Sequence, residues 1–266
     1  MSIHQPALDL SPGATLPSPP LPAAGERWAL FLDVDGTLLE LADDPRSVTA
    51  SPPLIALLQG LHAALDGALA LVSGRTLAEL DRVFGNPGWT VVGLHGLDLR
   101  HADGMRRRLP VATDDQERMR AAVQVLAGRF PDVRREAKGV AAALHCRQAP
   151  GQFPRLLAAA QGVVRDLPGY EVQPGNLVVE LKPSGMDKGR AVAELLHQVP
   201  FAGRRPVYVG DDLTDEHAFA VVNDAAGLSV RVGWREPSAA RCMLAGPQAV
   251  HDWLRGVLAV GGCRHA

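Results

Sequence analysis

The stretch WALFLDVDGT, residues 28–37, joins a short apolar run to a loop that carries two carboxylates. Trp28–Leu32 is apolar throughout, which is typical of a strand buried on both faces of a parallel sheet. Asp33-Val34-Asp35-Gly36-Thr37 follows this run directly. In open α/β sheets, ligands bind beyond the carboxyl ends of the strands. The stretch therefore predicts a functional site where this strand ends.

Apolar strands alternate with helical patterns on both sides of the middle of the chain. The first part has a helix over 51–65, a strand over 68–72, a helix from Thr76 and a strand over 90–94. After Pro183 the pattern resumes, with a helix over 187–197, strands over 206–209 and 227–232, and closing helices. This alternation predicts an α/β fold with a doubly wound, mostly parallel, Rossmann-like core sheet.

The middle of the chain has a different character. Hairpin patterns flank residues 101–104, 138–139 and 174–176, and helical patterns cover 113–129 and 151–166. Antiparallel strands mixed with helices are typical of a separate, smaller α+β unit. We therefore expect a core domain in two parts, 27–100 and 182–266, with a cap domain inserted over 101–181. Residues 1–26, rich in Pro and Ala, are expected to form a flexible tail.

Composition excludes several classes of protein. The net charge of −2 and the pI of about 6.5 give no reason to expect nucleic acid or an anionic membrane as partner. The sequence has no apolar run as long as the roughly 18 residues that a membrane-spanning helix needs. The three cysteines, Cys146, Cys242 and Cys263, have neither metal-ligand nor redox spacing. A reducing cytoplasm is therefore the expected location.

Two further polar motifs follow predicted strands, and a lysine opens a predicted helix. Ser73-Gly74-Arg75 follows the strand over 68–72, Gly210-Asp211-Asp212 follows the strand over 206–209, and Lys188 begins the helix where the chain re-enters the core. Taken singly, each has an ordinary structural explanation as a turn, a helix start or a solvated lysine. Together with Asp33 and Asp35, and in this order, they favour a functional interpretation.

These residue types suit the cleavage of a phosphate monoester. A carboxylate such as Asp33 can attack phosphorus and split one difficult step into two, while Asp35 acts as the acid and then as the base. Mg²⁺ prefers carboxylate and phosphate oxygens, and Asp33 and Asp211 can hold it. The Ser73 hydroxyl can donate to the phosphate. Only three lysines occur beside 24 arginines, so Lys188 is a candidate for a site that needs a compact cation against phosphate.

The chain resembles the haloacid dehalogenase-like phosphatase superfamily. DVDGTL at 33–38, SGR at 73–75, MDKG at 186–189 and GDDLTDE at 210–216 are similar to its four motifs in sequence order. The resemblance implies Asp33 as nucleophile and Asp35 as acid/base, with Ser73 and Lys188 on the phosphate. It also implies that Mg²⁺ is held by Asp33, the backbone carbonyl of Asp35, and Asp211, with Asp212 and Asp215 in support.

More narrowly, the chain resembles the trehalose-6-phosphate phosphatase family. The supporting segments are GLHG at 93–96, EAKGVAAALHCR at 136–147, NLVVELKP at 176–183 and the GDDLTDE motif. The resemblance implies that Glu136, Lys138 and Glu180 contact the sugar, and that Gly74 and Arg75 line the substrate site. It further implies a small sugar phosphate as substrate, supplied by a trehalose-6-phosphate synthase. Asp98 and Cys146 depart from the family pattern, which has Glu and an aromatic residue there; His145 is interpreted as structural.

Three other functions remain open at this point. The chain can be a phosphatase for another sugar phosphate, such as sucrose 6-phosphate or a mannosyl glycerate phosphate. It can be a phosphomutase that returns the phosphoryl group to the sugar. It can also be a noncatalytic sugar-phosphate-binding domain that serves a synthase, although such a domain has no need to keep Asp33, Asp35, Lys188 and Asp211.

Overall fold

The structure, a computed structural model, describes residues 16–42 and 47–262 and contains two sheets. The larger sheet has the strand order β12-β11-β10-β1-β2-β3-β4-β5. Neighbouring strands from β12 to β3 run parallel, and β4 and β5 are added antiparallel at one edge. The predicted doubly wound, mostly parallel α/β core is therefore confirmed. Its strands are β1 (Trp28–Leu32), β2 (Leu69–Val72), β3 (Thr90–Gly93), β4 (Asp98–Arg100), β5 (Arg106–Arg108), β10 (Arg205–Gly210), β11 (Leu228–Val232) and β12 (Cys242–Leu244).

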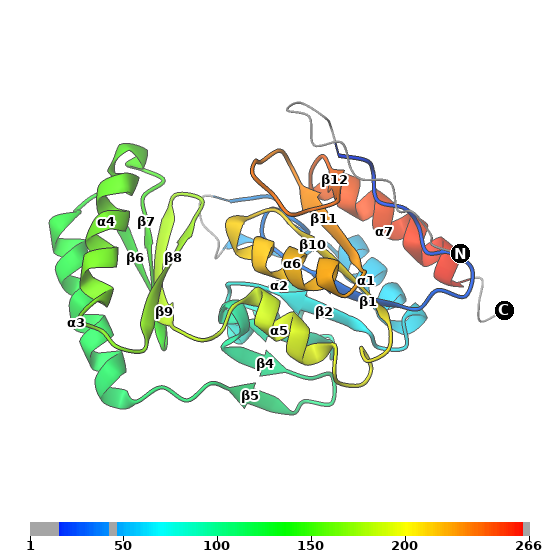
Figure 1. Cartoon of the computed structure of the whole chain (residues 1–266), viewed down its shortest axis with the longest axis horizontal. Helices are drawn as coiled ribbons and strands as arrows, with labels where there is room; N and C mark the ends of the chain where they lie inside the picture. Colours follow the sequence, from blue (N-terminus) through cyan, green and yellow to red (C-terminus); the bar gives the residue numbers. More distant parts are fainter. Residues whose placement is uncertain (1–15, 43–46, 263–266) are drawn as a thin grey trace.

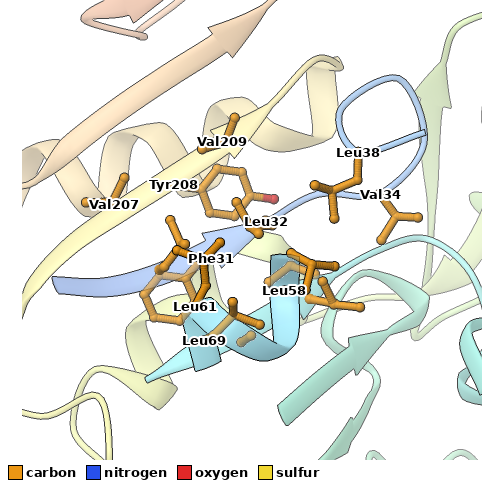
Figure 2. Packing of buried hydrophobic residues seen from close by; sticks show 14 of the residues in the cluster. Phe31, Leu32, Val34, Leu38, Leu58, Leu61, Leu69, Val207, Tyr208 and Val209 are labelled. Atoms are coloured by element: carbon orange, nitrogen blue, oxygen red, sulfur yellow. The ribbon is translucent and has the colours of Figure 1, made fainter. Parts of the chain in front are cut away.

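Helices cover both faces of the core sheet (Figure 1). α1 and α7 pack against each other, as do α5 and α6, while α2 packs against β3 and β4. Side chains of β1 and β10, among them Phe31, Leu32 and Tyr208, are buried between these layers (Figure 2). Phe31 stacks on Phe201, and Tyr208 packs edge-on against Phe219 of α6. The core helices are α1 (Pro52–Ala64), α2 (Leu77–Phe84), α5 (Lys188–Leu195), α6 (Glu216–Asp224) and α7 (Pro247–Gly262).

The inserted domain has its own sheet and its own hydrophobic core. The sheet order is β6-β7-β9-β8, all antiparallel, and α3 and α4 cover the face turned away from the core domain (Figure 1). Its apolar core is separate from that of the larger domain. The elements are α3 (Thr113–Arg129), β6 (Arg134–Lys138), β7 (Ala141–His145), α4 (Phe153–Val164), β8 (Tyr170–Gly175) and β9 (Val178–Pro183).

The predicted boundaries of the cap need correction. The start at residue 101 falls inside the β4–β5 hairpin, and this hairpin extends the core sheet. The end at residue 181 falls inside β9. The sequence shows the hairpin but not which sheet it joins, because a hairpin can add to either. We propose that the cap comprises residues 109–183.

The expected flexible tail also needs correction over its second half. Residues 1–15 lie outside the described part of the chain, whereas residues 16–26 run along the core domain. The Pro17 carbonyl accepts from Met243 N–H at 3.0 Å, and Trp253 Nε1 donates to the Pro20 carbonyl at 3.2 Å. Pro19 and Pro22 are buried. This segment packs through its carbonyl groups and proline rings. Sequence patterns predict ordered segments from periodic apolar residues, which this kind of packing does not require.

Two helix caps fix the loops that hold Ser73-Gly74-Arg75 and Lys188. Thr76 and Glu79 form a reciprocal capping box at the start of α2, directly after Ser73-Gly74-Arg75. Asp187 caps α5 by accepting from Arg190 N–H at 2.8 Å, which fixes the position of Lys188 as the first residue of that helix.

We predict that deletion of residues 1–24 lowers the melting temperature relative to deletion of residues 1–15. The longer deletion removes two hydrogen bonds from Met243 and Trp253 together with two buried prolines, a loss of about 2 kcal/mol. For a chain of this size that corresponds to a shift of roughly 4–8 °C in Tm. Differential scanning calorimetry of the two truncated proteins measures the difference, and equal melting temperatures would restore the view of residues 16–24 as a dispensable tail.

Candidate active site

Asp33 lies at the end of β1 in a buried network of charges. Its backbone N–H donates to the Val209 carbonyl on β10 at 2.9 Å, and the residue is 4% exposed. Lys188 Nζ lies 2.7 Å from Asp33 Oδ1 and 2.7 Å from Asp215 Oδ1. The Tyr208 hydroxyl donates to the same oxygen of Asp215 at 2.7 Å. The structure thus joins three of the four sequence motifs through one lysine.

The charges in this network are strongly perturbed. Burial raises the pKa of Asp33 well above its usual range, and the ammonium of Lys188 opposes the shift. Burial, followed by the charge of Asp215, raises the pKa of Asp211 to about 7. Burial alone would lower the pKa of Lys188, but Asp215 and Asp33 outweigh it and raise the pKa above its ordinary value. Lys188 is therefore a fixed cation among carboxylates that need more positive charge than it supplies.

These carboxylates have a donor set that suits a divalent cation. Oxygen atoms of Asp33, Asp211 and Asp215 lie within 4.8 Å of one another, so one ion can contact all three. Mg²⁺ favours hard oxygen ligands of this kind. Two of the predicted metal ligands, Asp33 and Asp211, belong to the group. Asp215, expected only in support, belongs to it as well.

The loop after β1 comes very close to Asp211. Gly36 has φ +82°, and a Cβ at this position would lie 2.2 Å from Asp211 Oδ2. The Thr37 hydroxyl donates to Asp211 Oδ1 at 3.2 Å. Both the left-handed backbone and the close approach require glycine at position 36. The third residue after Asp33 is thus fixed by the need to bring the two carboxylates together.

Asp35 and Arg75 form a bidentate ion pair that the sequence did not predict. Arg75 Nε lies 2.7 Å from Asp35 Oδ2, and Arg75 Nη2 lies 2.6 Å from Asp35 Oδ1. Arg75 is 5% exposed, and its backbone N–H donates to Ser73 Oγ at 3.1 Å. Arg75, expected to line the substrate site, therefore also orients the carboxylate expected to act as acid/base. Accepting from Arg75 N–H leaves the proton of the Ser73 hydroxyl available for another acceptor.

The cap brings its three predicted sugar-contacting residues to the same place. Lys138 Nζ lies 3.3 Å from Glu180 Oε1 and donates to the Gly74 carbonyl of the core at 3.1 Å. Glu136 Oε2 lies 2.6 Å from His145 Nε2, and this hydrogen bond is the main reason that the pKa of Glu136 lies below its usual value. His145 is thus hydrogen-bonded within the cap.

One cavity of about 160 Å³ connects the two groups of residues. It lies between the domains, below the cap sheet and above the ends of the core strands. Asp211 lines a neighbouring groove instead, although it remains within reach of Asp33. The sequence-predicted residues that line the cavity are Asp33, Asp35, Ser73, Gly74, Arg75, Glu136, Lys138, Glu180 and Lys188.

Comparisons with known proteins agree with this arrangement. The trehalose-phosphatase family model matches residues 31–248. The chain is 42% identical over 235 residues to a probable trehalose-phosphate phosphatase of Sinorhizobium fredii, covering 88% of this chain and 87% of the relative. It is 38% identical over 240 residues to the trehalose-6-phosphate phosphatase of Escherichia coli, covering 90% of each.

The chain belongs to the trehalose-phosphatase family. It is accordingly a phosphoric monoester hydrolase. Solved structures agree at the level of the fold, which is haloacid dehalogenase-like. The C-terminal domain of the Candida albicans trehalose-6-phosphate phosphatase has a TM-score of 0.78 and 22% identity, covering 88% of this chain and 92% of that one. Within the described ranges, no helix combines the length and apolar character needed to cross a membrane.

The two departures from the trehalose-phosphatase pattern lie away from the cavity. Asp98 is 1% exposed and pairs with Arg106 and Arg108 in the β4–β5 hairpin. Cys146 is buried in the cap core, where its Sγ lies 3.2 Å from the Leu177 carbonyl. Both residues therefore serve packing within one domain, and neither lines the substrate cavity.

Several residues that line the cavity were not identified from the sequence. His95 lies between the domains, with Nε2 2.8 Å from Glu180 Oε2. Arg147 of the cap donates to the Ala42 carbonyl of the core at 2.6 Å. For His95 a signal was present, since it stands in the GLHG segment directly after a strand. Arg147 had none, because an arginine after a strand is common on protein surfaces.

We predict that Glu180 stabilises the fold above about pH 5 and not near pH 2. Burial raises its pKa, but Lys138 and His95 outweigh burial and lower the pKa from 4.5 to about 2. A carboxylate with a depressed folded-state pKa contributes stability above its unfolded pKa, and this is lost as the pH falls through the folded value. The difference in unfolding free energy between the native protein and Glu180→Gln should therefore shrink from pH 6 to pH 2. Urea titrations across that range measure it, and a constant difference would contradict the buried ion pair.

Proposed function

We propose that this chain hydrolyses trehalose 6-phosphate to trehalose and phosphate, with Mg²⁺ as cofactor and a phospho-aspartate formed on Asp33. The observation that carries the proposal is the cavity itself. Its floor has a buried carboxylate beside a fixed ammonium, and its roof has the polar residues Glu136, Lys138 and Glu180. The relatives named trehalose-phosphate phosphatases support the choice of sugar.

The first chemical step falls to Asp33. One carboxylate oxygen attacks phosphorus, and the bond from phosphorus to the sugar oxygen breaks. Asp33, Asp211 and the backbone carbonyl of Asp35 would hold Mg²⁺, with Asp215 beside them, and the ion would supply positive charge to the phosphate. Lys188 keeps one Asp33 oxygen at 2.7 Å, which orients the carboxylate and leaves its second oxygen for attack.

Asp35 carries the proton in both steps. As an acid it protonates the leaving sugar oxygen, and as a base it takes a proton from the water that attacks the phospho-aspartate. Phosphate then leaves and Asp33 is regenerated. Because Arg75 holds Asp35 as a bidentate pair, this contact has to weaken when Asp35 is protonated. The substrate phosphate is an anion that competes for the same guanidinium, which is consistent with Arg75 in the substrate site.

The cap supplies the choice of substrate. The core site contacts the phosphate and the metal ion, which are the same for every phosphate monoester. The sugar therefore has to be recognised elsewhere. Carboxylates accept hydrogen bonds from hydroxyl groups and an ammonium donates to their oxygens, which suits Glu136, Glu180 and Lys138. We further propose that the enzyme works in the cytoplasm after a synthase that makes its substrate. The two described cysteines are free and buried, which is consistent with that compartment.

Phosphate release from a panel of substrates tests the proposal. With Mg²⁺ present we expect the highest kcat/KM for trehalose 6-phosphate, ahead of sucrose 6-phosphate, glucose 6-phosphate and p-nitrophenyl phosphate, and no turnover in EDTA. A preference for sucrose 6-phosphate would change the sugar but keep the reaction. An isomeric sugar phosphate without free phosphate would identify a phosphomutase.

We predict that Asp33→Asn abolishes turnover and leaves the fold intact. Asparagine has nearly the same shape as aspartate, but its neutral amide is a poor nucleophile and a poor metal ligand. Phosphate release and circular dichroism measure the two properties. Turnover close to that of the native enzyme would remove Asp33 from the mechanism.

We predict that Lys188→Arg costs at least about tenfold in kcat, or about 1.4 kcal/mol. The Lys188 ammonium fits between two carboxylate oxygens at 2.7 Å each, and its side chain is 3% exposed. A planar guanidinium is longer and spreads its charge, so it cannot occupy the same point. Steady-state kinetics with saturating Mg²⁺ measure kcat, and an unchanged value would show that a compact cation is not required.

A further inference from the structure

The segment that follows β3 has an unusual backbone. Leu94, His95 and Gly96 have φ values of 51°, 56° and 107°, so two residues with side chains adopt the left-handed region in succession. Such residues are uncommon there, and each is strained. The segment is fixed to the neighbouring motif, since Leu94 N–H donates to the Arg75 carbonyl at 2.9 Å and His95 N–H donates to the Ser73 carbonyl at 3.0 Å.

This backbone places the His95 ring in the interface between the domains. A Cβ added at Gly74 would lie 2.5 Å from His95 Nε2, so the ring edge lies directly over that glycine. The same nitrogen lies 2.8 Å from Glu180 Oε2 of the cap. His95 and Glu180 are both buried, at 9% and 5% exposure. A core histidine thus reaches across to one of the cap residues assigned to the sugar.

The chemistry of the pair fixes which group donates. Glu180 is ionised, because its pKa of about 2 lies far below neutral pH, and an ionised carboxylate only accepts. Burial lowers the pKa of His95 despite its carboxylate neighbour, so the ring is neutral and has a single N–H. That N–H has to be on Nε2, facing Glu180. A neutral donor orients Glu180 without cancelling its charge.

Lys138 completes the arrangement from the other side. Its ammonium lies 3.3 Å from Glu180 Oε1 and donates to the Gly74 carbonyl at 3.1 Å. The Glu180 carboxylate is therefore held by a hydrogen bond with His95 of the core on one oxygen and by an ion pair with Lys138 of the cap on the other. The cap and core meet at Gly74 through both the His95 ring and the Lys138 ammonium. Both cross-domain contacts require the cap to lie against the core.

We propose that His95 is a positioning residue that makes sugar recognition by the cap depend on closure over Asp33. The proposal rests on the proposed function, in which Glu180 accepts from a sugar hydroxyl. With the cap docked, His95 and Lys138 orient the carboxylate to receive that hydroxyl; with the cap lifted, the His95 contact is lost. Sugar binding to Glu180 therefore stabilises the docked cap, which brings the phosphate to Asp33 and excludes water.

A matched pair of substitutions tests His95. His95→Asn keeps a residue that tolerates the left-handed backbone, but its side chain is too short to reach Glu180. His95→Gln has an amide that reaches further. We expect His95→Asn to lower the ratio of kcat/KM for trehalose 6-phosphate to that for p-nitrophenyl phosphate by roughly tenfold, with part of the loss in kcat. His95→Gln should recover most of it. His62→Asn, on α1 and outside the cavity lining, is the control and should leave the ratio unchanged.

A double-substitution cycle with Glu180→Gln separates positioning from a general role in folding. If His95 acts through Glu180, adding His95→Asn to Glu180→Gln causes no further loss in the ratio. The proposal would be overturned if the fold-losses of the two single variants multiply in the double variant. It would also be overturned if His95→Asn impairs turnover of both substrates equally. If His95→Asn does not fold, the same cycle is run with His95→Gly, which tolerates the left-handed backbone and has no side chain to reach Glu180.

The native enzyme distinguishes failure of this proposal from failure of the proposed function. If the native enzyme prefers another sugar phosphate, the assigned substrate is wrong, and the cycle is measured with the preferred substrate. Non-additive losses would then still support the role of His95, and additive losses would overturn it. A native enzyme that hydrolyses only p-nitrophenyl phosphate overturns both proposals.

Discussion

The position of one ammonium group governs the rest of this structure. Lys188 lies between the buried carboxylates of Asp33 and Asp215, and a carboxylate oxygen of Asp211 lies within 4.8 Å of oxygens of both. Removing one member of such a buried pair leaves an uncompensated charge, at a cost of about 3–5 kcal/mol. Asp33 and Lys188 are 155 residues apart in sequence, so the two parts of the core domain that flank the cap have to come together before the charges meet. The parallel order β10-β1-β2 achieves this, because it brings the carboxyl ends of these strands to one edge.

The two domains meet where the backbone can approach most closely. Gly74 has the His95 ring directly over it, and its carbonyl oxygen accepts a hydrogen bond from the Lys138 ammonium. Gly36 has the matching role beside the carboxylate cluster, where a side chain would collide with Asp211. Both glycines follow core strands, β2 and β1, that are fully buried. Rigid strands thus hold two close backbone approaches, one beside the proposed metal site and one beneath the cap.

Much of the core could be predicted from the sequence, because its strands are uninterrupted apolar runs followed by polar motifs. The α3 helix over Thr113–Arg129 was predicted to the residue, and the polar motifs do gather at one edge. What the sequence concealed depends on contacts between distant backbones. The proline-rich segment 16–26 packs through carbonyl groups, the β4–β5 hairpin joins the core sheet instead of the cap, and β12 is too short to show a pattern. The Arg75–Asp35 and His95–Glu180 pairs were hidden for a related reason. Each pair joins residues that are far apart in sequence and belong to no common helix or strand pattern, so only the fold brings them together.

The charge around the cavity gives an independent reason to expect a cation with the substrate. Among the described residues that line it, six carboxylates face four cationic side chains, and the cationic side chains are already paired or bonded within the protein. Asp211 and Asp215, just behind, add to the negative side. A phosphate monoester carries up to two further negative charges, and charges a few Å apart in a buried site repel strongly. Entry of the phosphate alone would therefore be opposed by the site that is meant to receive it. A divalent ion among Asp33, Asp211 and Asp215 reverses that balance, so metal and phosphate are expected to bind with each favouring the other. Under the proposed function, this surplus of carboxylates therefore favours an anion that binds together with a divalent cation.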